Sequence, residues 1–383
     1  MMFIGGEMDP EGLGVSKLEE GFETKLLKIG NPDRFDEGTR SLEALEEAAR
    51  LIREGQLVAF PTETVYGLGA NGLDGRAVAK IFAAKGRPQD NPLILHIYSN
   101  KDLEKLTDTD LKPYRKLMED LWPGPLTLVF KRSESVPDRV TAGGDTVGVR
   151  MPSSPCCRAF LRACKLPIAA PSANLSGRPS PTQAGDVMAD MEGKIPLILD
   201  GGPSDIGIES TVVDLSSGKD KALVLRPGYY TLEDLRAYLP EIQLDKGLKQ
   251  GHIPKSPGQK YKHYSPKAQL TVFVGRQEAG EKEIIKEYIA RSGNSRVGLL
   301  LFRESVPAVL AAIKKEGLPE PFYIDQGPIR EPEIMGHSLF TNLRLFDREG
   351  VDEILAQGLE DQGYSLSIMN RMKKAAAGRV IKV

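Results

Sequence analysis

The feature of this 383-residue chain that most constrains its fold is a regular alternation of short apolar runs with longer stretches of helical periodicity. Residues 25–29 and 57–61 are apolar runs of strand length. Between them, apolar side chains recur at helical spacing from residue 41 until Gly55 ends the helix. The alternation continues to about residue 239, with helices expected over 77–84, 114–121 and 183–191. This pattern predicts a mixed α/β sheet.

The alternation lapses between residues 240 and 268, where prolines and glycines leave no room for a regular element, so a linker is predicted there. Beyond it, short strand and helix units return, and crossovers of this length suggest a small Rossmann-like parallel sheet. Two domains are therefore expected. The predicted divisions are a flexible leader at 1–22, a first α/β domain at 23–239, the linker at 240–268, and a smaller Rossmann-like α/β domain at 269–383.

Composition and charge exclude several classes of protein. The net charge of −2 argues against a polycation that coats nucleic acid, so any RNA contact would need a local patch of positive charge. No apolar run approaches the roughly 18 residues that span a bilayer. The first 20 residues are rich in glycine and acidic, unlike a signal peptide. We therefore predict a cytoplasmic protein without a membrane partner.

The cysteines and histidines form no metal-binding motif. Cys156, Cys157 and Cys164 fall within one predicted amphipathic helix at a spacing that fits no zinc site, and the four histidines are scattered. Free cysteine packs well in apolar cores, so we interpret these three residues as small buried side chains. No protein ligand for a metal is predicted.

A glycine-rich motif at residues 67–72, GLGANG, formally matches the dinucleotide-binding pattern GxGxxG and follows a predicted strand. That pattern also needs an acidic residue at the end of the next strand, whereas Asp90 precedes the next strand. The motif therefore favours a tight glycine turn close to a ligand over classical NAD binding.

Five separated segments place small, hydroxylated or cationic residues just after apolar runs. They are residues 61–67 (PTETVYG), 85–93 (KGRPQDNPL), 147–152 (VGVRMP), 171–182 (PSANLSGRPSPT) and 210–214 (STVVD). Many hydrogen-bond donors and several positive charges, without a Walker loop, are typical of a site for a polyanion. No nucleophile elbow, catalytic triad or paired carboxylates accompany them, so we expect a pocket that positions reactants and has no covalent nucleophile.

Individual cations in these segments permit two interpretations. Lys85 and Arg87 could cap the end of a helix or hold a ligand from a loop fixed by the flanking glycine and proline, and both are expected to be exposed in the empty protein. Arg150 could form a structural ion pair or clamp a carboxylate with two hydrogen bonds. His96 lies inside an apolar run and, taken alone, is interpreted as a core histidine.

The ordered segments resemble the motifs of a known family. Residues 61–68, 85–93, 171–182 and 210–212, followed by Leu225-Arg226-Pro227-Gly228, are similar to those of the YrdC/Sua5 family of threonylcarbamoyl-AMP synthases, over roughly residues 40 to 235. The linker at 256–266 (SPGQKYKHYSP) and the trailing α/β segment resemble the two-domain Sua5 form, with Gln259 where a methionine is expected. The resemblance implies a YrdC-like mixed, twisted sheet in the first domain.

The resemblance also implies an activity. Such enzymes use ATP with Mg²⁺, L-threonine and bicarbonate, without an organic cofactor, and release pyrophosphate. Their L-threonylcarbamoyladenylate is passed to the tRNA threonylcarbamoyl-transferase machinery for the threonylcarbamoyladenosine modification of tRNA (t6A37). A competing hypothesis is a non-catalytic protein of the same fold that binds a nucleotide or structured RNA.

Positions that match the family's motifs supply the expected ligand-binding residues. On the resemblance alone, His96 becomes a ligand-binding residue. Threonine would be held by Thr64, His96, Arg150 and Ser210; ATP or the adenylate would be held by Lys85, Arg87, Asn91, Thr146, Ser172, Asn174, Ser180 and Arg226. In the linker, cationic and aromatic residues alternate, which a mere spacer does not need. We therefore predict a lid formed by Tyr261, Lys262, His263 and Tyr264; the alternative is that these side chains only attach the linker to the surface.

Overall fold

The computed structural model describes residues 23–30, 40–247, 254–258, 260 and 263–383. Its first part contains an eleven-stranded mixed sheet in the order β1-β8-β2-β3-β7-β4-β6-β5-β9-β10-β11. The strands are β1 (Lys25–Lys28), β2 (Val58–Phe60), β3 (Gly67–Asn71), β4 (Ile94–His96), β5 (Leu126–Lys131), β6 (Thr146–Arg150), β7 (Ile168–Ala169), β8 (Leu197–Asp200), β9 (Thr211–Asp214), β10 (Leu223–Arg226) and β11 (Gln243–Leu244). The predicted mixed α/β fold is confirmed.

Helices cover both faces of this sheet and divide its core in two. The α-helices of the first part are α1 (Arg40–Arg53), α2 (Gly75–Lys85), α3 (Asn100–Leu106), α4 (Arg115–Leu121), α5 (Asp138–Thr141), α6 (Pro155–Cys164), α7 (Ala184–Met191) and α8 (Leu232–Arg236). Helices α1 and α6 pack over β1, β2 and β8, whereas α2, α3, α4 and α7 belong to the larger apolar cluster. The three cysteines of α6 are free and buried, as interpreted from the sequence.

The glycine-rich motif does not form the expected tight turn. It forms β3, which pairs antiparallel with β2, so that Gly69 lies opposite Val58. A Cβ atom at Gly69 would lie 2.8 Å from both Phe60 and Ile168. Glycine is needed here because neighbouring side chains cross the strand closely, which sequence reasoning mistook for a turn.

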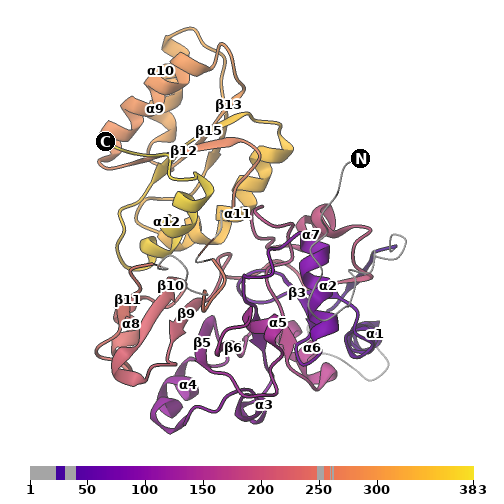
Figure 1. Cartoon of the computed structure of the whole chain (residues 1–383). Coiled ribbons are helices and arrows are strands. Elements are labelled where there is room, and N and C mark those ends of the chain that lie inside the picture. The colour runs from indigo at the N-terminus through magenta and orange to yellow at the C-terminus, as the bar shows by residue number, and fades with distance from the viewer. Residues whose placement is uncertain (1–22, 31–39, 248–253, 259, 261–262) are drawn as a thin grey trace, which may run out of the picture.

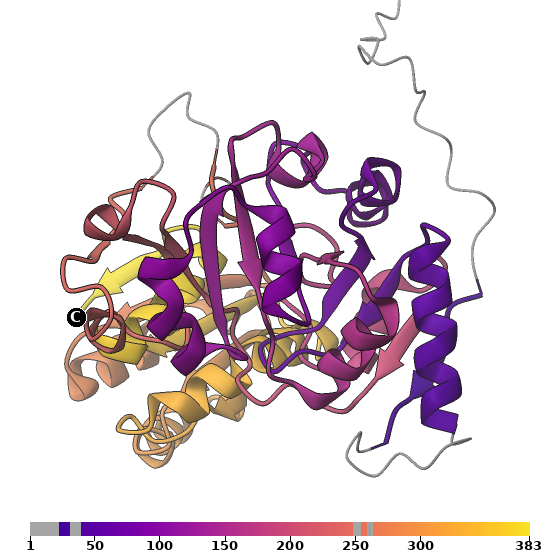
Figure 2. The same ribbon diagram turned by 90° about the horizontal axis from the view of Figure 1, so that it is seen from below.

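The second part is a five-stranded, all-parallel sheet in the order β14-β13-β15-β12-β16. Its elements are β12 (Gln269–Val274), α9 (Gln277–Arg291), β13 (Val297–Leu301), α10 (Val306–Lys315), β14 (Phe322–Asp325), α11 (Pro332–Arg348), β15 (Glu353–Gly358), α12 (Gly363–Ala375) and β16 (Val380–Lys382). The parallel sheet confirms the predicted topology class. Figure 1 shows α11 and α12 on the side of this sheet that faces the first part, and Figure 2, from below, shows the first part in front of the second.

The two sheets end and begin close to the predicted divisions, with one difference. Strand β11 lies inside the segment expected to be linker, because it pairs with β10 through Leu223 and Val224. The leader at 1–22 lies outside the described residues. Within the part of the chain that is described, no helix combines the length and apolar character needed to cross a membrane.

Helix α11 is fastened to the first part by a buried ion pair. The Arg344 guanidinium donates to the Asp190 carboxylate at 2.8 Å and to the carbonyl oxygen of Pro179 at 2.6 Å. Both charged side chains are nearly inaccessible to solvent, and Arg178 donates to the same carboxylate at 2.5 Å. Nearby, the hydroxyls of Thr182 and Thr341 lie 2.9 Å apart.

Arg344→Met is expected to lower the free energy of unfolding by about 3 kcal/mol, because it leaves a buried carboxylate with one partner fewer. Urea unfolding monitored by far-ultraviolet circular dichroism measures the change. Arg348→Met is the matched control on the same helix: Arg348 is half exposed and lies 3.6 Å from Asp186. The control should change stability by less than about 1 kcal/mol, and equal losses in the two variants would contradict the buried pair's importance.

Candidate functional site

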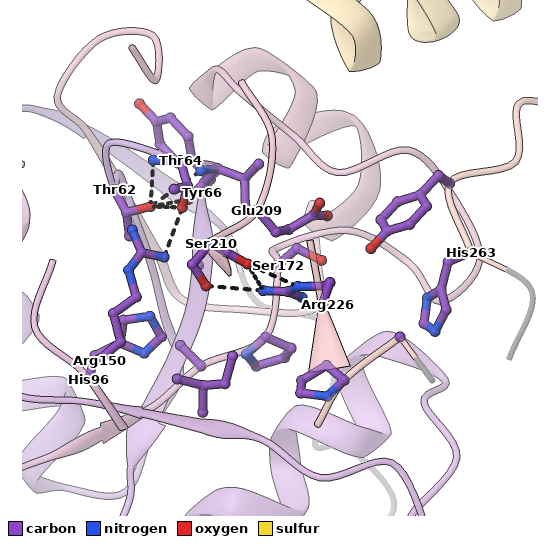
Figure 3. A pocket seen from close by; sticks show the side chains of 18 of the residues that line it. Thr62, Thr64, Tyr66, His96, Arg150, Ser172, Glu209, Ser210, Arg226 and His263 are labelled. Carbon is purple, nitrogen blue, oxygen red and sulfur yellow. Dashed lines mark hydrogen bonds between the residues drawn. The ribbon is translucent and has the colours of Figure 1, made fainter. Parts of the chain in front are cut away.

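One pocket gathers residues from all five predicted segments and from the linker (Figure 3). In the figure, Arg150 and His96 lie at one end, His263 lies at the other, and Ser210 and Arg226 lie between them. The pocket is lined by Thr62, Thr64, Val65, Tyr66, Gly67, Arg87, Ile94, His96, Arg150, Ala170, Pro171, Ser172, Glu209, Ser210, Arg226, Pro257, Gly258, His263 and Tyr264.

The segment after β2 is folded by its own hydroxyl groups. The Thr62 hydroxyl donates to the Val65 carbonyl oxygen at 2.7 Å and accepts from the backbone N–H groups of Thr64 and Val65, each at 3.2 Å. The Thr62 and Thr64 hydroxyls lie 2.9 Å apart. This turn fixes the Thr64 hydroxyl within the pocket, where it accepts from the Arg150 guanidinium at 2.8 Å.

Arg150 stands at the end of β6 and forms a buried ion pair. Its Nη2 lies 2.7 Å from Oε1 of Glu63, and both side chains are 5% exposed. Burial raises the pKa of Glu63, but the charge and hydrogen bond of Arg150 outweigh it, and the pKa lies below its ordinary value. The structural ion pair weighed from the sequence is therefore present. Arg150 also lines the pocket, so a bound carboxylate would share the guanidinium with Glu63.

His96 is held in its neutral form. Burial, followed by the positive charge of Arg150, lowers its pKa to about 3. Its ring packs edge-on against Phe60 at a centroid distance of 6.0 Å, and Nδ1 has no hydrogen-bond partner among the described residues. A neutral imidazole in a pocket can serve as a hydrogen-bond donor or acceptor for a ligand without adding charge.

Ser210 and Arg226 form the middle of the pocket. The Arg226 guanidinium donates to the Ser210 carbonyl oxygen from Nε at 3.1 Å and from Nη2 at 3.0 Å, and to the Ser210 hydroxyl at 3.1 Å. Strand β5 supports the same hydroxyl, because Thr127 Oγ1 lies 2.8 Å from Ser210 Oγ. Arg226 is thus oriented by neutral acceptors within the pocket.

The expectation that Lys85 and Arg87 are exposed is wrong: they are 2% and 9% exposed. Helix α2 ends at Gly86 in a left-handed conformation (φ 60°), which turns Arg87 inward. Arg87 donates to the carbonyl oxygens of Asn91 at 3.2 Å and Pro92 at 3.0 Å and lines the pocket. Burial, and then the charge of Arg87, lowers the pKa of Lys85 well below its ordinary value.

Lys85 therefore supports the fold of a pocket segment. Its Nζ donates to the Ser172 carbonyl oxygen at 2.5 Å and to that of Asn174. Removing the amine would leave buried carbonyl groups unsatisfied, so a Lys85→Ala variant would lose stability, unlike a substitution at the exposed position expected from the sequence.

The structure brings some of the predicted ligand-binding residues to the pocket wall and leaves others behind it. On the wall are Thr64, Arg87, His96, Arg150, Ser172, Ser210 and Arg226; not among the lining residues are Lys85, Asn91, Thr146, Asn174 and Ser180. Thr146 begins β6, at the opposite end of the strand from Arg150. The Asn174 side chain is engaged by its own loop: its amide donates to the carbonyl oxygens of Leu175 and Arg178.

Two of the four predicted lid residues can be placed. His263 and Tyr264 line the pocket, while Tyr261 and Lys262 lie outside the described residues. The Tyr264 ring stacks on Phe340 of α11 at a centroid distance of 5.1 Å. Burial, followed by the charge of Arg87, lowers the pKa of His263 to about 4. Tyr264 thus joins the linker to the second part, as the surface-attachment alternative expected, and both residues also face the pocket, as a lid requires.

Sequence reasoning gave no role to two acidic residues of the site. Glu63 lies inside the first segment and binds Arg150, and Glu209 directly precedes the fifth segment and accepts from Ser180 Oγ at 2.6 Å. Acidic residues within otherwise cationic motifs are a usable signal, because buried arginines need partners.

The pH dependence of the free energy of unfolding should reveal that His96 is neutral in the folded protein. Because its folded-state pKa of about 3 lies below the ordinary 6.5, the unfolded chain binds more protons between these values, and stability falls as pH falls below 6.5. Between pH 7 and pH 5, His96 should lower the free energy of unfolding by roughly 2 kcal/mol. His96→Gln should flatten the dependence of urea-unfolding free energy on pH by that amount. An unaltered slope in His96→Gln would contradict the buried neutral imidazole.

Similarity to known protein families divides the chain into the same two parts as the structure. A family model described as telomere recombination matches residues 50–228, and one described as threonylcarbamoyl-AMP synthase, C-terminal domain, matches residues 230–377. A Bacillus subtilis protein named threonylcarbamoyl-AMP synthase is 46% identical over 353 residues, covering 91% of this chain and 98% of that protein. A Schizosaccharomyces pombe protein of the same name is 37% identical, covering 88% of this chain and 89% of its own length.

A solved structure extends the similarity to three dimensions. The crystal structure of Pyrococcus abyssi Sua5 complexed with L-threonine superimposes with a TM-score of 0.83 at 41% sequence identity, covering 94% of this chain and 99% of that one. With 94% of this chain covered, the similarity extends over both sheets. The chain therefore belongs to the threonylcarbamoyl-AMP synthase family, in its two-domain Sua5 form.

Proposed function

We propose that this protein is an L-threonylcarbamoyl-AMP synthase, a nucleotidyltransferase that converts ATP, L-threonine and bicarbonate into threonylcarbamoyl-AMP, pyrophosphate and water. The observation that carries the proposal is the convergence of Arg150, His96 and Ser210 with Arg226 in one pocket. The similarity to a protein crystallised with L-threonine supports the same assignment. No observation favours a protein that only binds RNA or a nucleotide.

The end of the pocket around Arg150 suits an amino acid. Its guanidinium would hold the threonine carboxylate, and the hydroxyls of Thr64 and Ser210 offer neutral hydrogen-bond partners. The neutral His96 adds a polar group without repelling the ammonium or amine. In this arrangement the threonine nitrogen would react with bicarbonate to give a carbamate and water. The carbamate oxygen would then attack the α-phosphorus and expel pyrophosphate.

The other end of the pocket suits the nucleotide. Arg226 and Arg87 would face the phosphates, and Ser172 offers a further hydroxyl. Among the described residues no three histidine, cysteine or acidic side chains cluster to hold a metal ion, so Mg²⁺ enters the proposal as a partner of the ATP phosphates without a named protein ligand. Catalysis would rest on proximity and on stabilisation of charge.

The product is a mixed anhydride that water hydrolyses readily. It must be consumed by an acyl-transfer reaction, and we propose that the acceptor machinery is a tRNA threonylcarbamoyl-transferase acting in the cytoplasm. Direct contact of this chain with tRNA would then be weak and dispensable, as its net charge of −2 suggests.

Incubation with ATP, L-threonine and bicarbonate tests the function. Pyrophosphate and threonylcarbamoyl-AMP should appear together, as measured by coupled phosphate release and mass spectrometry, and both should vanish when threonine or bicarbonate is omitted. Nucleotide binding without pyrophosphate release under these conditions would contradict the proposal in favour of a binding protein.

Arg150→Ala should weaken threonine binding about 10- to 100-fold, because a charge-assisted contact is lost, while the affinity for ATP changes little. The variant should also melt at a lower temperature, since Glu63 loses its buried partner. Titration calorimetry measures both affinities. Arg132→Ala is a suitable control, because Arg132 pairs with Asp138 away from the pocket. Unchanged threonine affinity in a folded Arg150→Ala variant would remove this residue from the substrate site.

His263→Ala should reduce protection of the adenylate from water, if the linker acts as a lid. The expected result is a larger fraction of AMP relative to threonylcarbamoyl-AMP in the reaction mixture, measured by chromatography over time. Lys246→Ala, at an exposed position before the undescribed part of the linker, should not change this ratio. A wild-type product ratio in His263→Ala would show that the linker has no such role.

A further inference from the structure

Helix α12 of the second sheet inserts an arginine behind the pocket. Arg371 is 0% exposed, and its Nε donates to Oε2 of Glu209 at 3.1 Å. Its Nη2 donates to the Glu209 carbonyl oxygen at 3.2 Å, and its Nη1 donates to the Pro227 carbonyl oxygen. One side chain of the second part thus contacts both residues 209 and 227, which flank Ser210 and Arg226 in sequence.

Glu209 places a negative charge in the pocket, where it would repel the phosphates of a nucleotide. It lines the pocket together with Arg226. Burial raises the pKa of Glu209, but Arg371, Arg226 and the Ser180 hydroxyl together outweigh burial and hold it below its ordinary value. The charges of two arginines thus favour the ionised carboxylate, although only Arg371 forms an ion pair with it. The Glu209 carboxylate accepts from Ser180 and Arg371 and is also hydrogen-bonded to Tyr264, whereas Arg226 is directed to Ser210.

Because Glu209 is paired with Arg371 and Arg226 with Ser210, the positive charge of Arg226 stays available in the pocket. If Arg371 were absent, Glu209 would be a buried carboxylate without its ion-pair partner, which is strongly unfavourable. After Arg371, Arg226 is the cation whose charge most lowers the pKa of Glu209. Rotation of Arg226 toward Glu209 would neutralise the guanidinium that the proposed function assigns to the phosphates, and would also release the Ser210 hydroxyl.

We propose that Arg371, a residue of the second domain, is a positioning residue for nucleotide binding: by holding Glu209, it leaves Arg226 aligned on Ser210 and available to phosphate. The proposal rests on the assigned synthase function. It gives the second domain a role in the chemistry of the pocket that differs from support of the lid. Ser367, one turn earlier on α12, donates to the Gly228 carbonyl oxygen at 2.6 Å and fixes the same loop without touching Glu209.

The test is a double-mutant cycle in the full-length protein, measured by calorimetric titration with a non-hydrolysable ATP analogue. Arg371→Gln should lower the affinity for the analogue about tenfold, which is the loss expected when a charge-assisted contact is removed. Threonine affinity should change less than about threefold, because Arg150 keeps its own partner. Removing the competing carboxylate as well, in Arg371→Gln/Glu209→Gln, should restore the affinity to within about threefold of Glu209→Gln alone.

Two controls distinguish loss of the Arg226 position from a general weakening of the contact between the two domains. Lys373→Gln removes one positive charge from the same helix at a partly exposed position, where Lys373 pairs with Asp361, and should leave nucleotide affinity unchanged. Ser367→Ala removes an interface contact without affecting Glu209, and it should lower the affinity for the analogue far less than Arg371→Gln does. If Arg371→Gln fails to fold, Arg371→Lys and the double variant still decide the question. The retained charge should give an affinity between wild type and the expected tenfold loss.

The outcomes are distinct from those that test the function itself. No binding of the analogue by the wild-type protein would overturn the proposed function. Wild-type binding with an unchanged affinity in folded Arg371→Gln would overturn only the positioning role. The same holds if the double variant binds about tenfold more weakly than Glu209→Gln, since the loss would then not depend on the carboxylate.

Discussion

The choice of acceptor for each buried arginine decides what this pocket can bind. A guanidinium removed from water must have hydrogen-bond acceptors, but a carboxylate cancels its charge whereas a carbonyl or hydroxyl oxygen does not. Arg150 and Arg371 are paired with Glu63 and Glu209. Arg226 instead points to the carbonyl and hydroxyl of Ser210. Its positive charge is thus oriented by neutral groups, which is what a site for phosphate requires.

The same distribution separates the two ends of the pocket. At the end near Arg150, the paired Glu63 and the neutral His96 keep the local charge low, so that a zwitterionic amino acid can bind by exchanging one carboxylate contact for another. Toward Arg226, positive charge dominates and suits a polyanion. In the proposed reaction, this one pocket would hold two substrates of different charge and bring a carbamate near the α-phosphorus.

The sequence predicted the sheet classes and the segments of the site because both depend on local patterns. Apolar periodicity is repeated in each strand and helix, and the pocket's polar residues lie at strand ends: Thr64 just after β2, Arg150 at the last position of β6 and Ser210 just before β9. Burial of Lys85 was missed, because a cation at a helix end normally faces water. Only the tertiary fold, which places two carbonyl oxygens around its amine, makes burial favourable. Strand β3 was missed because close packing against Phe60 and a left-handed turn both demand glycine.

Contacts between the two sheets could not be predicted from any local pattern. Arg344 and Arg371 stand on α11 and α12, helices whose periodicity indicates only which face is apolar, and their partners lie more than 150 residues away in sequence. Each arginine binds a segment that the sequence had assigned to the pocket: Arg344 holds the loop that leads to Ser180, and Arg371 holds the loop that leads to Ser210. The second sheet is therefore coupled to the pocket through buried charge. A change that separates the two sheets would expose or unpair Asp190 and Glu209 together, so the integrity of the pocket and the docking of the second sheet depend on the same ion pairs.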